Sequence, residues 1–577
     1  MTVLIDTTRD VSDRGGSGGP GPLDRQSRRS RKSGPKGRQV DEAALAQVRS
    51  LLGERPRRRD LLIQFLHLIQ DAYGHLSAAH IRALAEDMRL AQVEIYEVAS
   101  FYDHFDVVKE GETPPPPLTI RVCDGIACQL AGAEALLAAA KAATDPATVR
   151  VVRAPCMGGC DVAPAARVGD REVGHATAEG LLEVAAGDSS VALPDFEGLE
   201  AYRAKGGYDV LARVRSGELT AESVMDTLSG AGLRGLGGAG FPTGRKWGFV
   251  RGYPGPRYMT VNGDEGEPGT FKDRFYLERE PHAMLEGALI GAHVVEAERI
   301  YLYMRDEYPA VLEILTSEIA AVEKAGLCEV GFIELRRGAG AYICGEESAM
   351  LESIEGKRGL PRHRPPYIAE EGLWGRPTLN NNVETLHWVP SILAKGADWF
   401  ASQGKPDHPG FRSWSVSGRV AKPGMVRAPA GVSVRELIEL CGGMSEGHDF
   451  KAYLPGGASG GILPASKGDV PLDFGGELAE LGSFVGSHAV VVFSQADNMR
   501  DVALNLLDFF AHESCGQCTP CRGGTEKMAK LLRRDTLDEE AVRDLEQVMR
   551  DASICGLGQA APNPVNHLLV HFREDLR

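Results

Sequence analysis

The chain is 577 residues long, and its 80 acidic against 64 basic side chains give a formal net charge of −16. This length exceeds what one hydrophobic core supports, so three or more domains are expected. The acidic balance argues against nucleic acid as the main partner, because phosphate binding needs a basic face. No run of about 18 apolar residues occurs, so the sequence predicts no transmembrane segment and a cytoplasmic location.

The first segment, residues 1–39, is rich in Gly, Ser, Pro and Arg and lacks the apolar stretch of a secretory signal. It predicts a disordered basic tail, with a docking arm for a partner as the alternative. Residues 40–110 then show helical periodicity, including a broad apolar face over 60–69. Ser77 is the expected N-cap of a helix that runs through Met88. A small helical bundle is therefore predicted for 40–110.

Four prolines at 114–117 indicate a stiff linker and a domain boundary. After them come a predicted strand at 118–122, an Ala/Leu-rich helix at 131–143 and a second strand at 149–152. This order within so short a space predicts a compact α/β unit over 115–190.

Residues 200–405 alternate helical stretches with strands, such as those at 258–261 and 300–304, which favours a larger α/β domain. Short strands and Gly/Pro turns dominate 410–495 and predict a small β-rich module. Helical periodicity returns in 496–577.

Eleven cysteines are grouped along the chain, as is typical of metal binding rather than of a disulfide framework. Cys515, Cys518 and Cys521 form a C-x2-C-x2-C run, and Cys555 follows at a distance. Three closely spaced thiolates can wrap one corner of a cluster, and a distant cysteine can complete it. A [4Fe–4S] cluster is the prediction, with structural zinc as the alternative.

A second set of four cysteines consists of Cys123-x4-Cys128 and Cys156-x3-Cys160. Each pair follows a predicted strand, so both pairs can lie in neighbouring loops at one end of a sheet. Four such thiolates suit a [2Fe–2S] cluster, and zinc is again the alternative. The isolated cysteines are expected to be buried apolar side chains: Cys328, Cys344 and Cys441.

Residues 235–240 satisfy G-x-G-x-x-G, but a predicted helix at 221–228 precedes them, whereas a Rossmann fingerprint follows a strand. A glycine cradle still offers N–H groups to a phosphate, and Lys246 is close enough in sequence to add a cation. A flexible structural turn is the alternative.

Three further segments carry polar groups suited to a cofactor. Residues 262–269 place an amide and carboxylates after a strand, where a solvated acidic turn is the alternative. Residues 338–347 are glycine-rich and lead into a helix. Residues 380–385 hold three asparagines and a threonine, which predict either an exposed loop or a polar cofactor wall.

These segments, in this order, resemble the NADH-binding flavoprotein of respiratory complex I, of NAD-reducing hydrogenases and of NAD-dependent formate dehydrogenases. The matching strings are GGAGFPTG at 237–244, DEGEPGTFKDR at 264–274, GEESA at 345–349 and ESCGQCTPCR at 513–522. The resemblance covers 206–577. Residues 40–187 resemble the small [2Fe–2S] subunit of the same complexes, which has a helical bundle followed by a thioredoxin-like domain.

The resemblance implies a multidomain α/β fold. It consists of the helical bundle, a thioredoxin-like [2Fe–2S] domain, a Rossmann-like domain for FMN and NAD(H), a β-grasp-like module and a C-terminal helical bundle with the [4Fe–4S] cluster. It also implies that FMN is held by Gly235, Gly237, Gly238, Lys246, Asn262, Asp264, Gly345, Asn381, Asn382 and Thr385. The residues implied to receive NAD(H) are Phe241, Phe249, Glu267, Glu347 and Tyr367.

Glu267 is implied to position the nicotinamide while hydride passes directly to FMN. The cysteine sets become the implied cluster ligands: Cys123, Cys128, Cys156 and Cys160 for [2Fe–2S], and Cys515, Cys518, Cys521 and Cys555 for [4Fe–4S]. One departure from the family pattern is Leu236, which stands where an arginine is usual. Tyr367 replaces a common phenylalanine and keeps an aromatic face.

The fusion of both subunit types in one chain most resembles the β subunit of a molybdenum- or tungsten-dependent formate dehydrogenase. A partner subunit would then carry the metal and oxidise formate. The alternatives are the diaphorase subunit of an NAD-reducing hydrogenase and a complex I-type NADH dehydrogenase. A non-enzymatic, zinc-stapled scaffold is a more remote alternative, and such a protein would be colourless.

Overall fold

The computed structural model describes residues 37–576 and begins with the helical bundle. The predicted tail, residues 1–39, lies almost entirely outside the described residues. Ser77 caps α3 as predicted, since its hydroxyl accepts a hydrogen bond from the His80 N–H at 3.0 Å. The apolar face predicted within 60–69 is buried. The elements of the bundle are α1 (Glu42–Leu52), α2 (Leu62–Tyr73), β1 (Leu76–Ser77), α3 (Ala78–Met88), α4 (Gln92–Ala99) and β2 (Val107–Val108).

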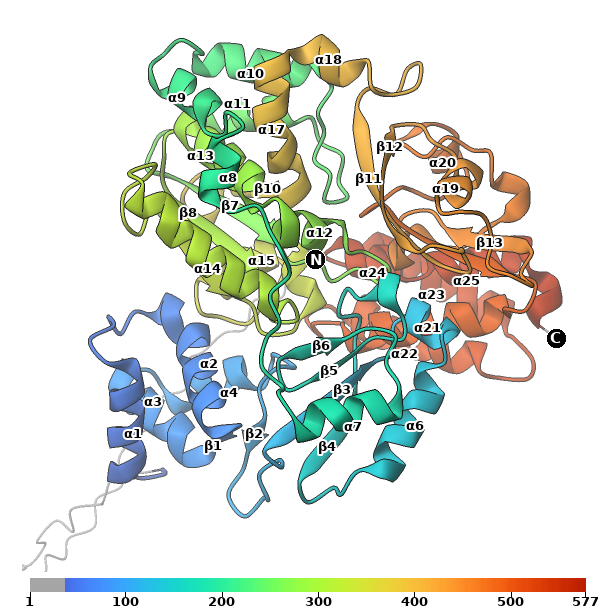
Figure 1. The fold of residues 1–577 in the computed structure, drawn as a ribbon. Helices are drawn as coiled ribbons and strands as arrows, with labels where there is room; N and C mark the ends of the chain where they lie inside the picture. The colour runs from blue at the N-terminus through green and yellow to red at the C-terminus, as the bar shows by residue number, and fades with distance from the viewer. Residues whose placement is uncertain (1–36, 577) are drawn as a thin grey trace, which may run out of the picture.

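The second unit is a four-stranded sheet in the order β4-β3-β5-β6, with α6 and α7 packed on it (Figure 1). Its first two strands are parallel and the others antiparallel. Because β3 and β4 run in the same direction, the cysteines at and beyond their ends meet at one edge. The elements are β3 (Leu118–Cys123), α5 (Ile126–Leu130), α6 (Ala133–Ala143), β4 (Val149–Ala154), β5 (Ala166–Val168), β6 (Arg171–Val173) and α7 (Ala178–Ala186).

The largest unit is built on a four-stranded parallel sheet in the order β10-β7-β8-β9. Its strands are β7 (Arg257–Gly263), β8 (Ala297–Met304), β9 (Ile333–Arg337) and β10 (Thr378–Asn382). The helices around it include α10 (Ala221–Gly230), α11 (Thr243–Gly252), α12 (Lys272–Arg279), α13 (Pro281–Val295), α14 (Pro309–Lys324), α15 (Glu347–Ile354) and α17 (Val383–Lys395).

One expectation for this unit needs correction. The sequence predicts either an exposed loop or a polar cofactor wall for the asparagine run, but Asn380, Asn381 and Asn382 end the strand β10 and pair in register with β7. Asn380 and Asn381 are buried. The exposed-loop alternative is therefore wrong. Consecutive amides do not show strand periodicity, so the β-ladder with β7 could not be seen in the sequence.

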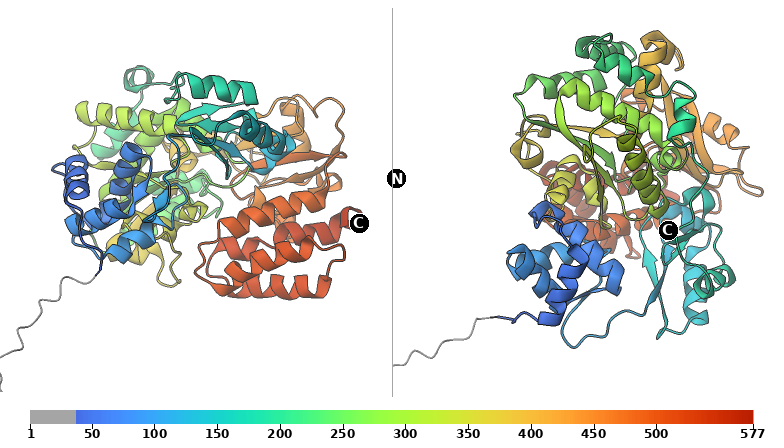
Figure 2. Two further views of the ribbon diagram at one scale, coloured as in Figure 1. Left: turned by 90° about the horizontal axis from the view of Figure 1, so that it is seen from below. Right: turned by 60° about the vertical axis from the view of Figure 1, so that its left-hand side comes forward.

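The small β-rich module is a five-stranded sheet in the order β12-β11-β15-β13-β14. It contains β11 (Phe411–Gly418), β12 (Gly424–Pro429), α19 (Val434–Leu440), β13 (Phe450–Leu454), β14 (Leu463–Pro464) and β15 (Ala489–Ser494). The helices that follow pack beside it (Figure 2). They are α21 (Met499–His512), α22 (Thr519–Leu532), α23 (Glu539–Ala552), α24 (Gly556–Ala560) and α25 (Asn563–His571). The predicted multidomain α/β fold is confirmed.

Buried polar contacts fix the N-terminal bundle against the parallel-sheet unit. The guanidinium of Arg336 donates to the Asp60 carboxylate at 2.7 Å and to its backbone carbonyl at 2.5 Å. Tyr102 donates to the Ser353 hydroxyl at 2.9 Å. Removing one partner of a buried ion pair such as Arg336–Asp60 costs about 3–5 kcal/mol. These contacts therefore make the interface between the bundle and the parallel-sheet unit, here called the joint, a rigid one. No helix within residues 37–576 is long and apolar enough to cross a bilayer.

A close approach of two helices in the large unit gives a test of its packing. An added Cβ at Gly287 on α13 would lie 2.1 Å from the carbonyl oxygen of Leu386 on α17. We expect Gly287→Ala to destabilise the fold by about 1–3 kcal/mol and to lower the midpoint of thermal unfolding by about 2–4 °C per kcal/mol. Calorimetry of the cofactor-loaded protein measures this.

Gly252→Ala is the matched control, because Gly252 is the exposed last residue of α11 and no other described atom lies within 4 Å of an added Cβ. Its midpoint should stay unchanged or rise slightly. Equal midpoints for the two variants would contradict the close approach of α13 and α17.

Candidate functional site

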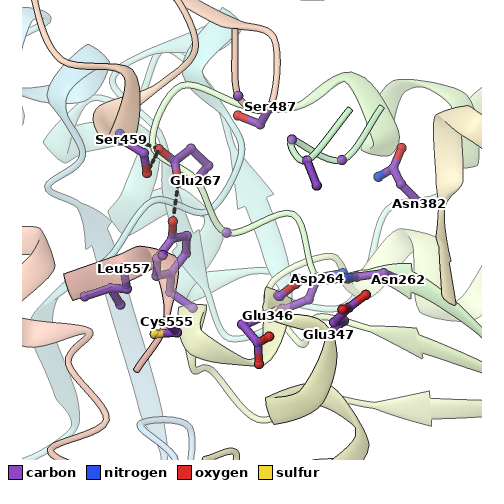
Figure 3. A pocket seen from close by; sticks show the side chains of 18 of the residues that line it. Asn262, Asp264, Glu267, Glu346, Glu347, Asn382, Ser459, Ser487, Cys555 and Leu557 are labelled. Atoms are coloured by element: carbon purple, nitrogen blue, oxygen red, sulfur yellow. Dashed lines mark hydrogen bonds between the residues drawn. The ribbon is translucent and has the colours of Figure 1, made fainter. Parts of the chain in front are cut away.

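The main cavity, about 640 Å³ in volume, lies where the parallel-sheet unit, the β-rich module and the C-terminal helices meet. Its floor is formed by the carboxyl ends of β7 and β10, the position at which open parallel sheets bind ligands. The volume falls in the range of small-molecule and cofactor sites. Figure 3 shows side chains from all three units pointing into the space.

A buried carboxylate without a full set of partners lies at the sheet end of the main cavity. The backbone N–H of Asp264 donates to Asn262 Oδ1 at 3.1 Å, and Asn262 Nδ2 donates to the carbonyl of Gly345 at 2.9 Å. Asp264 Oδ2 is buried with no hydrogen-bond partner among the described residues. Burial raises the pKa of this carboxyl well above its usual range. A ligand hydroxyl group would satisfy it, so the geometry fits a polyol chain such as the ribityl group of FMN.

The glycine loop 235–240 connects α10 to α11 and forms a second wall. At Gly237 an added Cβ would lie 3.0 Å from the Cβ of Asn382, so the loop approaches β10 closely. Lys246, in the first turns of α11, lines the cavity with its cation. Backbone N–H groups, a helix N-terminus and a lysine fit a phosphate group. Thr385 does not line the cavity; it is buried behind the loop and accepts the Leu236 N–H at 2.9 Å.

Glu267 faces the cavity from the opposite side and is held at both carboxylate oxygens (Figure 3). Tyr342 donates its hydroxyl to one oxygen, and the other accepts the N–H and the hydroxyl of Ser459, each at 2.8 Å. Burial raises the pKa of Glu267, while these donors oppose the shift. The carboxylate is therefore fixed in orientation by residues of two different units.

The aromatic residues implied to receive NAD(H) lie outside the cavity wall. Phe241, Phe249 and Tyr367 are 40%, 50% and 59% exposed, unusually open for large apolar side chains. The first two rings lie 6.1 Å apart, with the Arg245 guanidinium 5.8 Å from each ring centre. Glu347 lines the cavity, and its carboxylate lies 3.7 Å from Lys246 Nζ.

Sequence reasoning assigned no role to several wall residues: Glu265, Lys272, Asp273, Tyr342, Glu346 and Ser459. Lys272 is buried and pairs with Asp273 at 2.8 Å and with Glu384 at 3.1 Å. Most of these residues lie inside the two family-like strings 264–274 and 345–349, so the strings themselves could have pointed to them. Ser459 belongs to the β-rich module, and nothing in its local sequence pointed to the cavity.

The first cysteine set converges at the edge of the β3/β4 sheet, and all four thiols are buried. The sulfur atoms of Cys156 and Cys160 are 3.4 Å apart. The backbone N–H of Ala165 donates to the Cys128 sulfur at 3.3 Å, a contact that stabilises a thiolate. An added Cβ at Gly125 would lie 3.2 Å from the Cβ of Cys156. The four buried thiols in tight glycine-flanked loops fit a [2Fe–2S] cluster.

The second cysteine set lines one small pocket between α22 and α24. Burial raises the pKa of the Cys555 thiol to about 12. Binding of a metal would release the proton of such a thiol. The four thiols fit a [4Fe–4S] cluster. Cys555 and Leu557 also line the main cavity, which places this pocket directly behind the cavity wall (Figure 3).

One buried arginine connects the first cysteine set to the main cavity. Arg305 donates to the backbone carbonyl of Cys156 at 2.7 Å and to that of Glu265, which lines the cavity. Its guanidinium also lies 4.9 Å from the centre of the Tyr308 ring. The loops of the two sites are therefore held at a fixed distance.

Four known sequence families match successive parts of the chain. A thioredoxin-like [2Fe-2S] ferredoxin family matches residues 48–187, and the Nuo51 FMN-binding domain matches 228–391. The SLBB domain matches 415–463, and the NADH-ubiquinone oxidoreductase-F iron-sulfur binding region matches 501–577.

Whole proteins match as well. The F 2 subunit of NADH-quinone oxidoreductase in Rhizobium meliloti strain 1021 is 43% identical over 402 residues, which is 67% of this chain and 95% of the relative. This chain belongs to the family of NADH-quinone oxidoreductase F subunits. The NADP-reducing hydrogenase subunit HndC of Solidesulfovibrio fructosivorans, 41% identical over 64% of this chain and 78% of its own, is similar too.

A solved structure extends the likeness to the N-terminal part. A chain of an NAD⁺-reducing [NiFe]-hydrogenase in the air-oxidised state superposes with a TM-score of 0.78 and 33% identity, covering 91% of this chain and 94% of that one. The present chain is thus a fusion of a 24 kDa-like [2Fe–2S] part with a 51 kDa-like flavoprotein. It is an NAD(H) oxidoreductase subunit with FMN, one [2Fe–2S] and one [4Fe–4S] cluster.

The cluster pocket beside the main cavity can be tested through Cys555. We expect Cys555→Ala to abolish the [4Fe–4S] signal in the electron paramagnetic resonance spectrum of the reduced protein, because a ligand is lost. The [2Fe–2S] signal and the flavin content should remain. Cys328→Ala, at a half-buried cysteine outside both sets, is the control and should keep both signals. Retention of the [4Fe–4S] signal in Cys555→Ala would contradict the ligand assignment.

Proposed function

We propose that this subunit passes electrons between NAD(H) and iron–sulfur clusters through FMN held in the main cavity, as the NAD⁺-reducing arm of a formate dehydrogenase. One observation carries the electron-transfer part: Cys555 lines both the main cavity and the cysteine pocket behind it. A flavin in the cavity would then lie against the wall that holds the cluster, with no intervening domain.

The proposed FMN residues divide by the group they hold. The glycine loop and Lys246 receive the phosphate, Asp264 and Asn262 receive the ribityl hydroxyls, and the β10 amides face the ring system. The full set is Gly235, Gly237, Gly238, Lys246, Asn262, Asp264, Gly345, Asn381 and Asn382, all of which line the cavity. Thr385 acts from behind, by fixing the loop through the Leu236 N–H.

FMN, when bound, would collect single electrons from the clusters and pass two of them to NAD⁺ as one hydride, or carry out the reverse when NADH is oxidised. The chain's own residues position the reactants. Glu267, held by Tyr342 and Ser459, is proposed to orient the nicotinamide. The exposed rings of Phe241, Phe249 and Tyr367 are proposed to stack on the adenine, with Glu347 near the ribose.

The [4Fe–4S] cluster is proposed as the main electron route, with Cys515, Cys518, Cys521 and Cys555 as its ligands. The [2Fe–2S] cluster on Cys123, Cys128, Cys156 and Cys160 is proposed as a side branch. Its loop is tied to the cavity loop by Arg305, which supports electronic contact between the two sites.

The proposed electron donor is formate, oxidised by a partner subunit that carries molybdenum or tungsten. The support is the fusion of both small-subunit types with NAD(H) and FMN sites in one chain. Hydrogen is the second candidate, and a specific observation favours it: the fused arrangement superposes along 91% of this chain on a subunit of an NAD⁺-reducing hydrogenase. A cytoplasmic location, expected from the sequence, stays a prediction.

Glu267→Gln tests the proposed role of that carboxylate. The change keeps the side-chain shape, removes the charge and turns one of the two acceptor oxygens into a donor. We therefore expect kcat/KM for NADH with an artificial acceptor to fall about tenfold or more, or about 1.4 kcal/mol in transition-state stabilisation. FMN and iron contents should match the wild type. Glu313→Gln, at an exposed position of α14, is the control. Unaltered steady-state kinetics in Glu267→Gln would remove Glu267 from the mechanism.

The electron donor is decided by capturing the native complex through a tag on this chain. We expect formate, and not hydrogen, to drive NAD⁺ reduction, and the co-purified large subunit to contain molybdenum or tungsten. NAD⁺ reduction by hydrogen alone, with nickel in the partner, would replace the formate assignment by the hydrogenase one. The complex captured through the Glu267→Gln protein is the control: it should contain the same partner and reduce NAD⁺ more slowly.

A further inference from the structure

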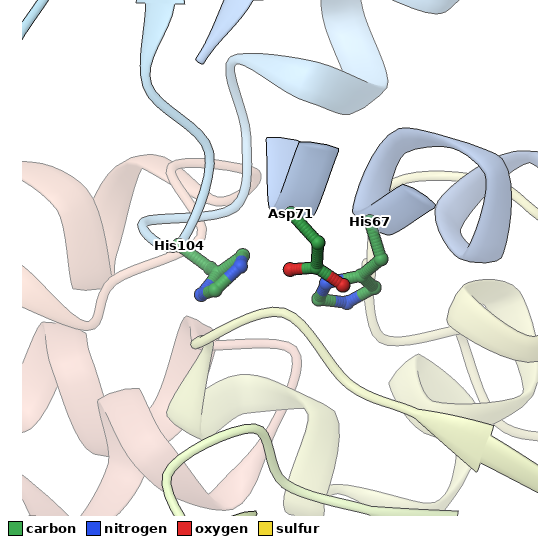
Figure 4. A group of neighbouring side chains, drawn as sticks. All are labelled: His67, Asp71 and His104. Carbon is green, nitrogen blue, oxygen red and sulfur yellow. The ribbon is translucent and has the colours of Figure 1, made fainter. Parts of the chain in front are cut away.

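Three potential metal ligands meet at the joint between the helical bundle and the parallel-sheet unit, away from both cysteine sets (Figure 4). His67 and Asp71 lie one turn apart on α2, so their side chains share a face of the helix. His104 lies in the segment after α4. One ligand atom from each of the three residues can be chosen so that all three lie within 4.8 Å of one another. Figure 4 shows the Asp71 carboxylate between the two imidazole rings.

One ring nitrogen of each histidine contacts an oxygen of the parallel-sheet unit. His67 Nε2 lies 2.8 Å from the carbonyl oxygen of Gly338, and His104 Nδ1 lies 2.8 Å from the carboxylate of Asp306. A backbone carbonyl and a carboxylate are the outer-shell partners that fix the tautomer of metal-binding histidines. In this arrangement Nε2 of His67 and Nδ1 of His104 carry the protons, which leaves the other nitrogens with lone pairs.

Those other nitrogens lack partners although they are buried. His67 is 3% exposed, and the side chain of His104 is 9% exposed. His67 Nδ1 and His104 Nε2 have no hydrogen-bond partner within residues 37–576. Two buried imidazole nitrogens without hydrogen-bond partners, beside a carboxylate, form a set of donor atoms that a cation could bind.

We propose that His67, His104 and Asp71 bind one divalent transition-metal ion, of which Zn²⁺ is the best fit. Two imidazole nitrogens and one carboxylate oxygen are a ligand set of zinc sites that have three protein ligands and a water molecule in the fourth position. The same set disfavours Mg²⁺ and Ca²⁺, which prefer oxygen ligands alone. Asp71 provides the open side of the site, because its side chain is 48% exposed.

Arg337 is the competitor for this ion. Its guanidinium donates to Asp71 at 2.7 Å and to Asp306 at 2.7 Å. Metal binding takes Asp71 from the guanidinium, which keeps its bond to Asp306. Arg167 also approaches Asp306, at 3.4 Å. The two arginines raise the local positive charge, so removal of Arg337 should strengthen cation binding.

The position of the site gives the ion a structural role. The backbone N–H groups of Asp103 and His104 donate to the carbonyls of Gly340 and Ala339 at 3.2 and 3.1 Å. That segment leads directly into Tyr342, which lines the main cavity. A metal on His67, Asp71 and His104 would fasten α2 and the segment after α4 to each other, against the loop 338–341 that leads into the main cavity. Metal binding should therefore stabilise the joint.

The test uses the full, cluster-loaded chain after treatment with a chelator, and follows Zn²⁺ by calorimetric titration. We expect one equivalent to bind and the thermal unfolding midpoint to rise, because an ion that binds only the folded state stabilises it. Asp71→Asn and His104→Gln should each weaken binding at least tenfold. Asp71→Asn alters a half-exposed side chain, so it keeps the test valid if the buried histidine variant does not fold. Iron content is measured before and after.

Two comparison variants are expected to leave the affinity for Zn²⁺ unchanged or to raise it. Asp103→Asn changes an exposed carboxylate next to His104 and should leave Zn²⁺ binding unchanged. Arg337→Gln should bind Zn²⁺ more tightly than the wild type. The proposal is overturned if the Asp71→Asn protein binds Zn²⁺ as tightly as the wild type. It is equally overturned if zinc uptake is accompanied by an equivalent loss of iron, which would place the zinc on cluster cysteines.

Discussion

The arrangement of redox sites depends on one buried cation, Arg305. Its guanidinium, 4% exposed, binds one backbone carbonyl in the [2Fe–2S] loop and another in the acidic loop of the main cavity. Because backbone carbonyls are bonded, the contact fixes main-chain positions and not only side chains. A buried charge that lost either partner would be strongly destabilising, so the thioredoxin-like domain cannot shift relative to the flavin domain without a large energetic cost. Electron transfer between the redox centres needs this constant distance between the two domains.

The main cavity is likewise a product of several units. Glu267 comes from the acidic loop, Tyr342 from the glycine-rich segment after β9, Ser459 from the β-rich module and Cys555 from the C-terminal helices. None of these units encloses the cavity alone. Among the described residues, those of the [2Fe–2S] part do not line the cavity wall. That part adds a second cluster and, through the helical bundle, a layer of packed helices against the strands that support the flavin.

Several buried charged groups lie around this cavity. Lys272 is almost fully buried among Asp273 and Glu384, and Asp264 Oδ2 is buried without a hydrogen-bond partner among the described residues. Uncompensated polar groups of this kind are costly in a core and are retained where a ligand completes them. Buried polar atoms without partners among the described residues also occur at His67 and His104 in the joint.

The amino-acid sequence was enough to predict the fold class and the cofactors, through strings that resemble a known family, and to group eight of the cysteines into two sets, because such strings and spacings are local properties of the chain. It also predicted the Ser77 cap and the helix before the glycine loop. Only the folded chain shows that the asparagine run is a strand, that Thr385 supports the loop from behind and that Ser459 fixes Glu267. Those facts depend on residues more than 100 positions apart, and no local pattern encodes such contacts.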